Sequence, residues 1–327
     1  MKKTKRRLGI YLLLLILITA AAVVLRTLAC FNDFNPTTGY FDDKLIITVA
    51  DWLTVGGVVL FLSYPIASGR VALRASFSSP MFYLPSGLVS VALLFLSAEL
   101  LSKVWGLLSE SARLQDSLLT AELLIPLAVA LLALCSIVYF LLGALIEGRC
   151  DTRRAAFGIL AVLFLAVYAA YLYFDTKLPI NAPTKVVDMM AYIFASAFFL
   201  FEVRISLGRD RWGAYLAFGM AAALLSGYSA LPSLIVYLVR GTLITNSLAE
   251  AALTMTLFIF ITARVLHATR LRDDEKNPAA AAAELLSAAR LADMSAEVAE
   301  ELDDDDESCD KEPDNYTMNF EDTESKD

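Results

Sequence analysis

The stretch LGIYLLLLILITAAAVVL, residues 8–25, contains 18 residues without a single charge. An α-helix of about 20 apolar residues crosses the hydrocarbon core of a bilayer, which is about 30 Å thick. Because a backbone in lipid must satisfy its own hydrogen bonds, such a stretch predicts a transmembrane helix. We therefore expect an all-α integral membrane protein with eight transmembrane helices. Seven further stretches of this kind follow, near residues 46–64, 82–104, 121–146, 155–174, 187–207, 212–236 and 247–267.

The composition of the chain supports this fold class and narrows the classes of function. Hydrophobic residues make up 58% of the 327 residues, whereas soluble domains contain about 45–50% apolar residues. The formal net charge is −8, but much of the acid follows residue 270, so the membrane part is close to neutral. This charge pattern does not predict a nucleic-acid partner.

The first apolar stretch has an alternative interpretation as a secretory signal. A basic start, MKKTKRR, precedes it, and Cys30 follows it at a position that resembles a lipid-modification site. The lipoprotein pattern has an aliphatic residue where this chain has Thr27, and Arg26 interrupts the apolar run. Signal cores also span only about 7–15 residues. We therefore expect a retained transmembrane helix.

Positive charges predict the orientation of the chain, because Lys and Arg accumulate in cytoplasmic loops. With a cytoplasmic N-terminus, the inner segments hold 17 Lys and Arg residues and the outer segments hold 7. Every inner connection carries at least two of them, as Arg70 and Arg74 do in the first. We therefore expect a multi-pass protein with both termini in the cytoplasm.

Two outer connections resemble each other and predict an internal duplication. FNPTTGYFDDKLIITVAD ends at Asp51 and FDTKLPINAPTKVVD ends at Asp188. The fourth and eighth spans begin with SLLTAE, ending at Glu122, and with SLAE, ending at Glu250. Copies of four helices have the same orientation, so we expect two parallel halves related by an axis along the membrane normal.

The expected parts of the chain are these two halves, residues 1–147 and 148–270, and a C-terminal region of different composition. Residues 271–302 contain a capping Asn277-Pro278 pair and then an Ala-, Leu- and Glu-rich stretch, which predict a cytoplasmic linker and helix. Residues 303–327 are acidic and polar, which predicts disorder.

Acidic residues inside the predicted spans form a candidate polar cluster near the outer leaflet. Charged side chains inside a membrane are costly and indicate function by default. A convergent cluster would bind a small cation, whereas the structural alternative is that carboxylates in first helical turns complement the helix dipole. The dipole alternative does not explain Glu99, which lies near the C-terminal end of its predicted span. Lys103 follows four residues later on the same helix face and could form an ion pair with it. The cluster consists of Asp51, Glu99, Glu122, Asp188 and Glu250.

At the inner ends of the sixth and eighth spans we expect a structural ion pair. Glu202 and Arg264 lie at similar depth there, and charges in a membrane need partners.

The sequence contains no set of residues that predicts catalysis, a metal site or a cofactor. It has one histidine, His267, and its four cysteines fall in different segments, so neither a zinc site nor a disulfide is expected. Nucleophile-elbow, phosphate-loop and zinc-protease motifs are missing. Asp33 and Asn35 begin a stretch that resembles a calcium loop, but Thr38 and Lys44 occupy the required Gly and Glu positions. We interpret that stretch as a re-entry turn.

Three segments carry a resemblance to uncharacterised multi-spanning membrane proteins of clostridia-like Gram-positive bacteria. They are FNDFNPTTGYF (31–41), LPINAPTK (178–185) and FFLFEVRISLG (198–208). The resemblance implies a bacterial cell-membrane location and brings no activity with it.

Two functions follow as hypotheses. The first is a non-enzymatic integral membrane protein with a sensory or partner-binding role, whose partner is a protein in the membrane or the cytoplasm. The second is a transporter or channel for a small cation that uses the outer-leaflet carboxylates.

Overall fold

The computed structural model describes residues 2–35, 38–42, 45–68, 80–114, 121–145, 152–175, 179, 181–207, 211–244 and 247–270. Within these residues the regular secondary structure is helical, apart from an isolated bridge between Phe34 and Phe41. All the helices belong to one unit of the chain, Met1–Glu275. In chain order they are α1 (Lys2–Asn32), α2 (Leu45–Leu62), α3 (Tyr64–Ser68), the 3-10 helix η1 (Pro80–Phe82), α4 (Tyr83–Leu114), α5 (Ala121–Leu145), α6 (Thr152–Phe174), α7 (Pro183–Ser206), α8 (Trp212–Arg240) and α9 (Leu248–Arg270).

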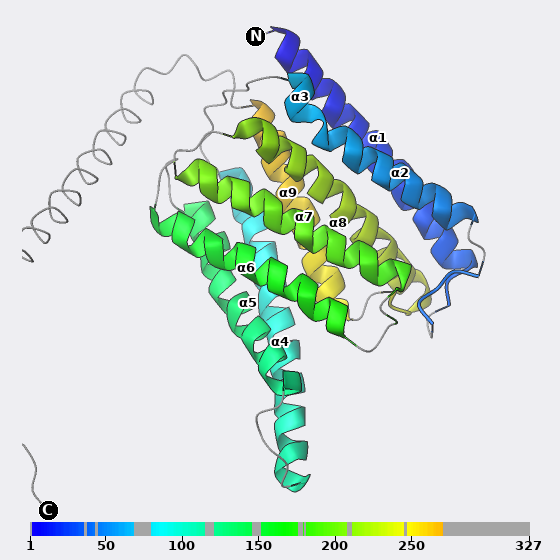
Figure 1. The fold of residues 1–327 in the computed structure, drawn as a ribbon, viewed down its shortest axis with the longest axis vertical. Coiled ribbons are helices and arrows are strands. Elements are labelled where there is room, and N and C mark those ends of the chain that lie inside the picture. Colours follow the sequence, from blue (N-terminus) through cyan, green and yellow to red (C-terminus); the bar gives the residue numbers. More distant parts are fainter. Residues whose placement is uncertain are drawn as a thin grey trace, which may run out of the picture. The chain divides into compact units, whose positions relative to one another are not determined.

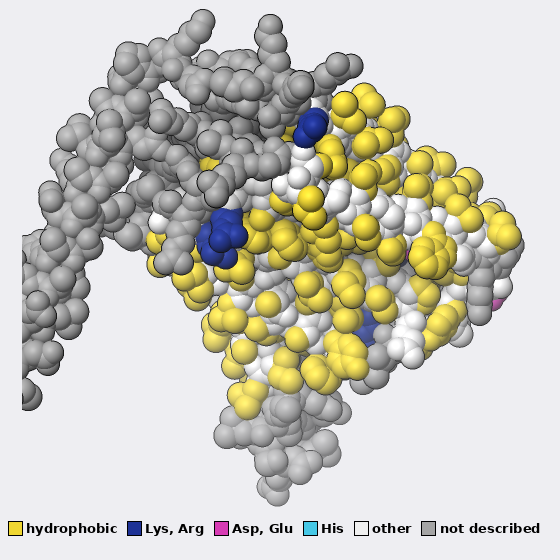
Figure 2. Space-filling model, turned by 45° about the horizontal axis from the view of Figure 1, so that its top comes forward, with side chains coloured by type: hydrophobic (Ala, Val, Ile, Leu, Met, Phe, Trp, Pro, Cys, Tyr) yellow, Lys and Arg dark blue, Asp and Glu magenta, His cyan; other side chains and the backbone are white. Residues whose placement is uncertain are grey.

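Eight of the described helices, α1, α2 and α4 to α9, are long and apolar enough to cross a membrane. Their outer faces expose large hydrophobic side chains such as Leu17, Trp52 and Leu238. In the view of Figure 2 hydrophobic side chains cover most of the described surface, and Lys and Arg are isolated on it. The chain is a multi-pass membrane protein. The predicted all-α fold is confirmed for the described residues, and the eight candidate spans agree in number with the predicted ones.

Helices α4 to α9 form a closed ring of neighbours. Each packs against the next one along the chain, and α9 packs against α4 to complete the ring. The hairpin of α1 and α2 lies outside the ring and docks mainly against α8, as Figure 1 shows. Because α8 has the ring on one side and the hairpin on the other, all its residues from Gly219 to Ala230 are buried.

Aromatic side chains fill the middle of the ring. The ring centroids of Phe140 in α5 and Phe199 in α7 lie 5.5 Å apart, and Phe260 in α9 lies 5.3 Å from Phe140 and 5.8 Å from Phe199. Contacts at these separations are favourable beyond the area that they bury. We call these three residues the aromatic layer.

Glycines allow two of the close helix contacts. A Cβ atom on Gly57 of α2 would lie 2.7 Å from Leu224 Cδ2 of α8, and one on Gly219 would lie 2.9 Å from Phe198 Cε2. Small residues let transmembrane backbones approach in this way. The neighbouring Gly56 takes no part in this contact, because a Cβ there would meet nothing within 4 Å.

Several helix ends differ from the predicted ends, and the longest extensions are those of α1, which runs from Lys2 to Asn32 against the predicted residues 8–25, and of α4. α4 continues to Leu114 instead of ending near residue 104, and the short helix α3 was not predicted. α7 begins at Pro183 rather than near residue 187, since Ala182 forms the N-cap and proline is preorganised for the first helical position.

The predicted duplication remains a prediction. α7 packs closely against α8, whereas the described residues of α2 and α4, the equivalent pair of the first half, show no comparable packing. The predicted cytoplasmic helix and acidic tail fall on residues 271–327, outside the described residues.

The connection between α1 and α2 is a tight turn. The Asn35 amide donates to Tyr40 O at 3.0 Å, and the Asp42 amide donates to Asp33 O at 2.8 Å. Gly39 has a φ of 72°, which favours glycine. These bonds agree with the interpretation of this segment as a re-entry turn.

Candidate functional site

The end of the bundle at which α1 ends and α2, α7 and α9 begin holds a buried set of charged side chains, and we call it the acidic end. Arg26 of α1 lies here and is only 2% exposed. Its guanidinium carbon lies 4.4 Å from the centre of the Tyr228 ring, a cation–π contact, and the guanidinium is hydrogen-bonded to the Cys30 side chain. Nε and Nη1 of Arg26 have no hydrogen-bond partner among the described residues.

Two neighbouring residues of α8 bind the aspartates of two other helices. The Tyr228 hydroxyl donates to Asp51 Oδ1 of α2 at 2.7 Å. The Ser229 hydroxyl donates to Asp188 Oδ1 of α7, which is 4% exposed. Both aspartates interact electrostatically with Arg26. The structure therefore brings together two of the acids that the sequence analysis selected.

The dipole explanation fails for both aspartates. The first turns of α2 and α7 contain no acidic residue, since these helices begin at Leu45 and Pro183. Asp51 and Asp188 lie a full turn deeper, where a carboxylate no longer meets unpaired amides. Their depth must instead be explained by their partners.

Glu250 of α9 is the third acid of the set and is 1% exposed. It does lie in the first turn of its helix. Its amide, however, donates to Ser247 Oγ at 3.1 Å, so Ser247 supplies the cap. Both carboxylate oxygens of Glu250 are buried and have no hydrogen-bond partner among the described residues. A buried carboxylate without a partner is costly unless its charge is balanced.

Hydroxyl groups surround the backbone of Glu250. Tyr192 Oη of α7 lies 2.7 Å from Thr254 Oγ1, and Thr254 donates to the Glu250 carbonyl at 2.9 Å. The rings of Tyr168 of α6 and Tyr192 pack edge to face, with their centroids 4.9 Å apart. These side chains close the space between Glu250 and the middle of the ring.

Charged neighbours of Glu250 come from three elements. Asp188 and Lys185 of α7, Asp175 after α6, and Glu99 and Lys103 of α4 all interact electrostatically with it. Two of these groups already have partners, because Lys103 Nζ lies 3.2 Å from Glu99 Oε1 and Lys185 donates to Asp175 O at 2.6 Å.

Glu99 and Glu122 are the two remaining residues of the predicted cluster. Glu99 is partly exposed and paired with Lys103, as its spacing in the sequence suggested. It does not end a helix, however, because α4 continues for about four more turns to Leu114. Glu122 lies in the first turn of α5, and its side chain is outside the described residues.

The opposite end of the ring holds a second buried charge pair. Arg264 Nη2 lies 3.6 Å from Glu202 Oε1, and the two side chains are 2% and 0% exposed. The Arg264 guanidinium also lies 3.9 Å from the centre of the Phe82 ring. These are the two residues that the sequence analysis paired, and the aromatic layer separates them from Glu250.

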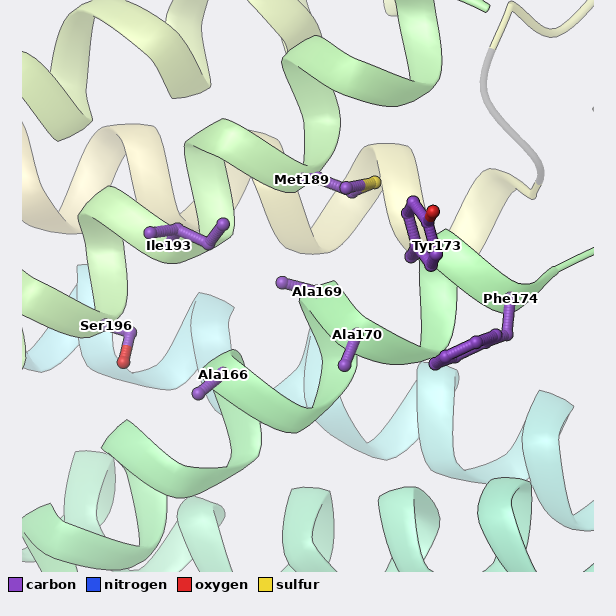
Figure 3. A pocket seen from close by; sticks show the side chains of 8 residues that line it. All are labelled: Ala166, Ala169, Ala170, Tyr173, Phe174, Met189, Ile193 and Ser196. Atoms are coloured by element: carbon purple, nitrogen blue, oxygen red, sulfur yellow. The ribbon is translucent and has the colours of Figure 1, made fainter. Parts of the chain in front are cut away.

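A pocket of about 340 Å³ opens between α6 and α7. Figure 3 shows its lining, which is apolar except for Tyr173 and Ser196. Alanines form its floor on α6, and Met189 and Ile193 border it on α7. It carries no group of the acidic set, so it does not serve as an entrance to Glu250.

Sequence reasoning missed Arg26, Tyr228 and Ser229. Arg26 follows the predicted apolar stretch of residues 8–25, but α1 continues to Asn32, so the residue lies inside the helix, where a charge indicates a functional position. Tyr228 and Ser229 gave no signal, because Tyr and Ser occur in many packed membrane helices.

Among the described residues, no group of three or more His, Cys, Asp and Glu side chains is arranged to hold a metal ion. Comparisons with family models, with curated proteins and with solved structures give no match to this chain.

Proposed function

We propose that this chain is a non-enzymatic sensor of a bacterial cell membrane, which binds a proton or a small monovalent cation between Asp188 and Glu250. The observation that carries the proposal is the Glu250 carboxylate, which is 1% exposed and has no hydrogen-bond partner among the described residues. Removing a charge from water costs several kcal/mol unless a partner balances it. A bound cation or a proton supplies that balance.

The charge count at the acidic end supports a small positive ligand. Lys103 pairs with Glu99, whereas Lys185 donates to the backbone carbonyl of Asp175 and not to its carboxylate. Arg26 interacts electrostatically with Asp51 and Asp188. Together with Glu250, these interacting groups are three cations and five acids, which is an excess of two negative charges when all are ionised. A divalent ion such as calcium takes six to eight oxygen ligands, and among the described residues no group of three or more His, Cys, Asp and Glu side chains is arranged to hold a metal ion. A proton or a monovalent cation fits this set better.

The aromatic layer favours sensing over conduction. Phe140, Phe199 and Phe260 are in mutual contact between the acidic end and the Glu202–Arg264 pair. An ion that crosses the ring needs polar groups along its way, and these rings offer none. The ligand therefore enters and leaves from the same side.

Several further parts of the proposal rest on the sequence. Both termini are cytoplasmic, so the acidic end faces outward, in agreement with the distribution of Lys and Arg. The two four-span halves derive from a duplication. Residues 271–302 contact a protein partner in the cytoplasm or membrane, and residues 303–327 form an acidic, disordered tail.

A cation transporter is the second candidate. It is favoured by the position of the buried Glu202–Arg264 pair, which belongs to the same ring as Glu250 and lies beyond the aromatic layer. A transporter would move the aromatic side chains during its cycle. Uptake of Na⁺, K⁺ or protons by sealed proteoliposomes distinguishes the two functions, since the sensor binds without net flux.

The proposed function is tested by the melting temperature of the purified chain in lipid nanodiscs. The buffers contain Na⁺, K⁺ or Li⁺ against the inert cation N-methyl-D-glucamine, and a separate series lowers the pH. A ligand at a hundred times its Kd stabilises the folded chain by about 2.7 kcal/mol, so we expect the melting temperature to rise in one series.

The Glu250→Gln variant keeps the shape of the side chain and removes its charge. We expect it to lose the response to the cation and to be at least as stable as the wild type without it. Asp42→Asn is the control and keeps the response, because Asp42 is an exposed acid of the α1–α2 turn outside the buried set. A full response in Glu250→Gln would overturn the proposed site.

A further inference from the structure

We infer that Arg26 is a tethered cation that competes with the bound ligand for Asp188, so that ligand uptake weakens the docking of the α1–α2 hairpin on α8. This inference rests on the proposed function and names the element through which the site signals. Its basis is the position of Arg26, which belongs to the hairpin but faces acids of both the hairpin and the ring.

The hairpin has a narrow attachment to the ring. Among the described helices of the ring, α8 supplies nearly all of its packing, with a minor contribution from α9. At the acidic end this interface contains Ala22, Ala50 and Tyr228, all fully buried, around the Arg26 contact. The charged set is therefore part of the docking surface itself.

The groups that face Arg26 come from each neighbouring helix. Cys30 of α1, Asp51 of α2, Tyr228 of α8 and Asp188 of α7 interact with it. Asp51 belongs to the hairpin and is partly exposed, so it moves with Arg26 and is screened by solvent. Asp188 is buried and belongs to the ring. The attraction of Arg26 to a carboxylate of the ring therefore depends on the charge of Asp188, whereas the Tyr228–Asp51 hydrogen bond and the Arg26–Tyr228 contact also join hairpin and ring.

Asp188 also faces the proposed ligand. It interacts electrostatically with Glu250, and Ser229 holds it in place through a hydrogen bond. A cation or proton that balances Asp188 and Glu250 leaves Arg26 buried beside the Tyr228 ring without a full counter-charge. Removing one partner of a buried charge is strongly destabilising, and movement of the hairpin toward water relieves the cost. The coupling is reciprocal, so Arg26 lowers the affinity for the ligand.

The opposite end of the hairpin is held by contacts that the ligand does not touch. There α3 packs against α8, and a Cβ atom on Gly213 of α8 would lie 3.4 Å from Pro65 Cβ of α3. Arg7 of α1 donates to Ala67 O and so ties α1 to α3. Deeper in the interface, the Gly57–Leu224 contact is apolar and independent of charge. The displacement is therefore expected at the acidic end, with the opposite end as the pivot.

Cys30 is a native reporter of this displacement. Its side chain is 1% exposed and lies in the interface with Phe41, Ile47 and Val236. The test measures its rate of alkylation by N-ethylmaleimide in nanodiscs, by mass spectrometry, in each buffer used for the melting series. N-acetylcysteine in the same buffer is the reference for the reactivity of thiols at each pH, because the thiolate is the form that reacts. Cys135 of α5 cannot serve, since it lies in the middle of the span Leu123–Leu142.

We expect the Cys30 rate relative to that of N-acetylcysteine to rise about fivefold or more when the stabilising cation or proton is present, which is the lower range for coupled sites. Arg26→Gln removes the tethered cation, so its Cys30 rate stays constant while its affinity for the ligand rises by a similar factor. Arg7→Gln is the matched control at the pivot and keeps the response. If Arg26→Gln does not fold, Asp51→Asn tests the inference instead. In this variant Asp188 is the only aspartate left beside Arg26, so the ligand must raise the alkylation rate of Cys30 by more than in the wild type.

The two proposals fail in different ways. If the ligand raises the melting temperature but the Cys30 rate stays constant in the wild type, the inference is overturned and the site remains. An unchanged or smaller rise in Asp51→Asn also overturns the inference. If neither the melting temperature nor the Cys30 rate responds to any ligand, the proposed function fails and the inference with it.

Discussion

Tyr228 and Ser229 are consecutive residues of α8, and each binds an aspartate of a different helix. Successive residues of an α-helix point about 100° apart, so one turn of α8 reaches both the hairpin and α7. The two hydroxyl groups thereby set the positions of Asp51 and Asp188 on either side of Arg26. Loss of one hydroxyl releases one acid and leaves the other in place.

The buried Glu202–Arg264 pair predicts how much the chain loses in stability when one of its two charges is removed. Glu202→Leu leaves the Arg264 charge buried without its carboxylate, so we expect a loss of about 3–5 kcal/mol in the free energy of unfolding. The double variant Glu202→Leu/Arg264→Met removes both charges and is expected to lie close to the wild type. Reversible unfolding in mixed micelles measures both.

Glu99→Leu is the control for that prediction. The Glu99–Lys103 pair is partly exposed, and its loss is expected to cost less than about 1 kcal/mol. A Glu202→Leu variant as stable as the control would show that the pair contributes nothing to folding.

Part of this residue-scale picture could be predicted from the sequence. Charges in a membrane need partners, and this rule selected Glu202, Arg264 and the acids of the outer leaflet. It could not show which acids face which partner, because that depends on the rotation of each helix. The side chain of Arg26 was missed for the same reason, since only its burial shows that it points inward.

At the scale of elements, the docking of the hairpin depends on the close approach of α2 to α8. Gly57 lies in that contact, with Leu224 on α8 and Ile18 on α1 as the nearest side chains, whereas its neighbour Gly56 faces away. Two adjacent glycines of the same helix therefore have opposite roles, and this gives a matched pair of variants.

We expect Gly57→Val to lower the melting temperature and to raise the alkylation rate of Cys30, because the larger side chain pushes α2 away from α8. Insertion of extra methyl groups into a packed interface costs about 1–3 kcal/mol. Gly56→Val adds the same atoms on an open face and is expected to leave both quantities unchanged. Equal effects of the two variants would contradict the packing of α2 described above.

The existence of the spans could be predicted from the sequence, whereas the residues at which the helices begin and end could not. Long apolar runs identify a transmembrane helix, but α4 continues past Trp105 beyond its apolar run to Leu114. α7 gains a turn at its start because Pro183 fits the first helical position. These ends matter for function, since the added turn places Asp188 too deep for a role at the helix terminus.

At the scale of the whole molecule, the ring of α4 to α9 and the outlying hairpin could not be derived from the sequence. Both lipid-facing and buried faces of these helices are apolar, so the pattern of hydrophobic residues does not show which helices are neighbours. Even the suspected duplication would have placed α1 and α2 as counterparts of α6 and α7, which are members of the ring.

The orientation of the molecule is predicted from its positive charges and is open to a direct test. In a chain without native cysteines, Thr38→Cys lies in the turn between α1 and α2 and Leu207→Cys follows α7, and both sites are exposed. A membrane-impermeant maleimide should label residue 38 in intact cells and residue 207 only after permeabilisation, since Lys and Arg accumulate on the cytoplasmic side. The reverse pattern would place the acidic end in the cytoplasm.

The burial of α8 between ring and hairpin has a consequence for the synthesis of the chain. α8 is the seventh span to be made, so α1 and α2 enter the membrane well before the helix that they dock against. During that interval Arg26 has neither the Tyr228 ring nor Asp188 fixed beside it, and its long side chain must extend to the headgroups to stay hydrated. A chain that stops before residue 212 therefore has six spans and a hairpin whose main docking partner is missing.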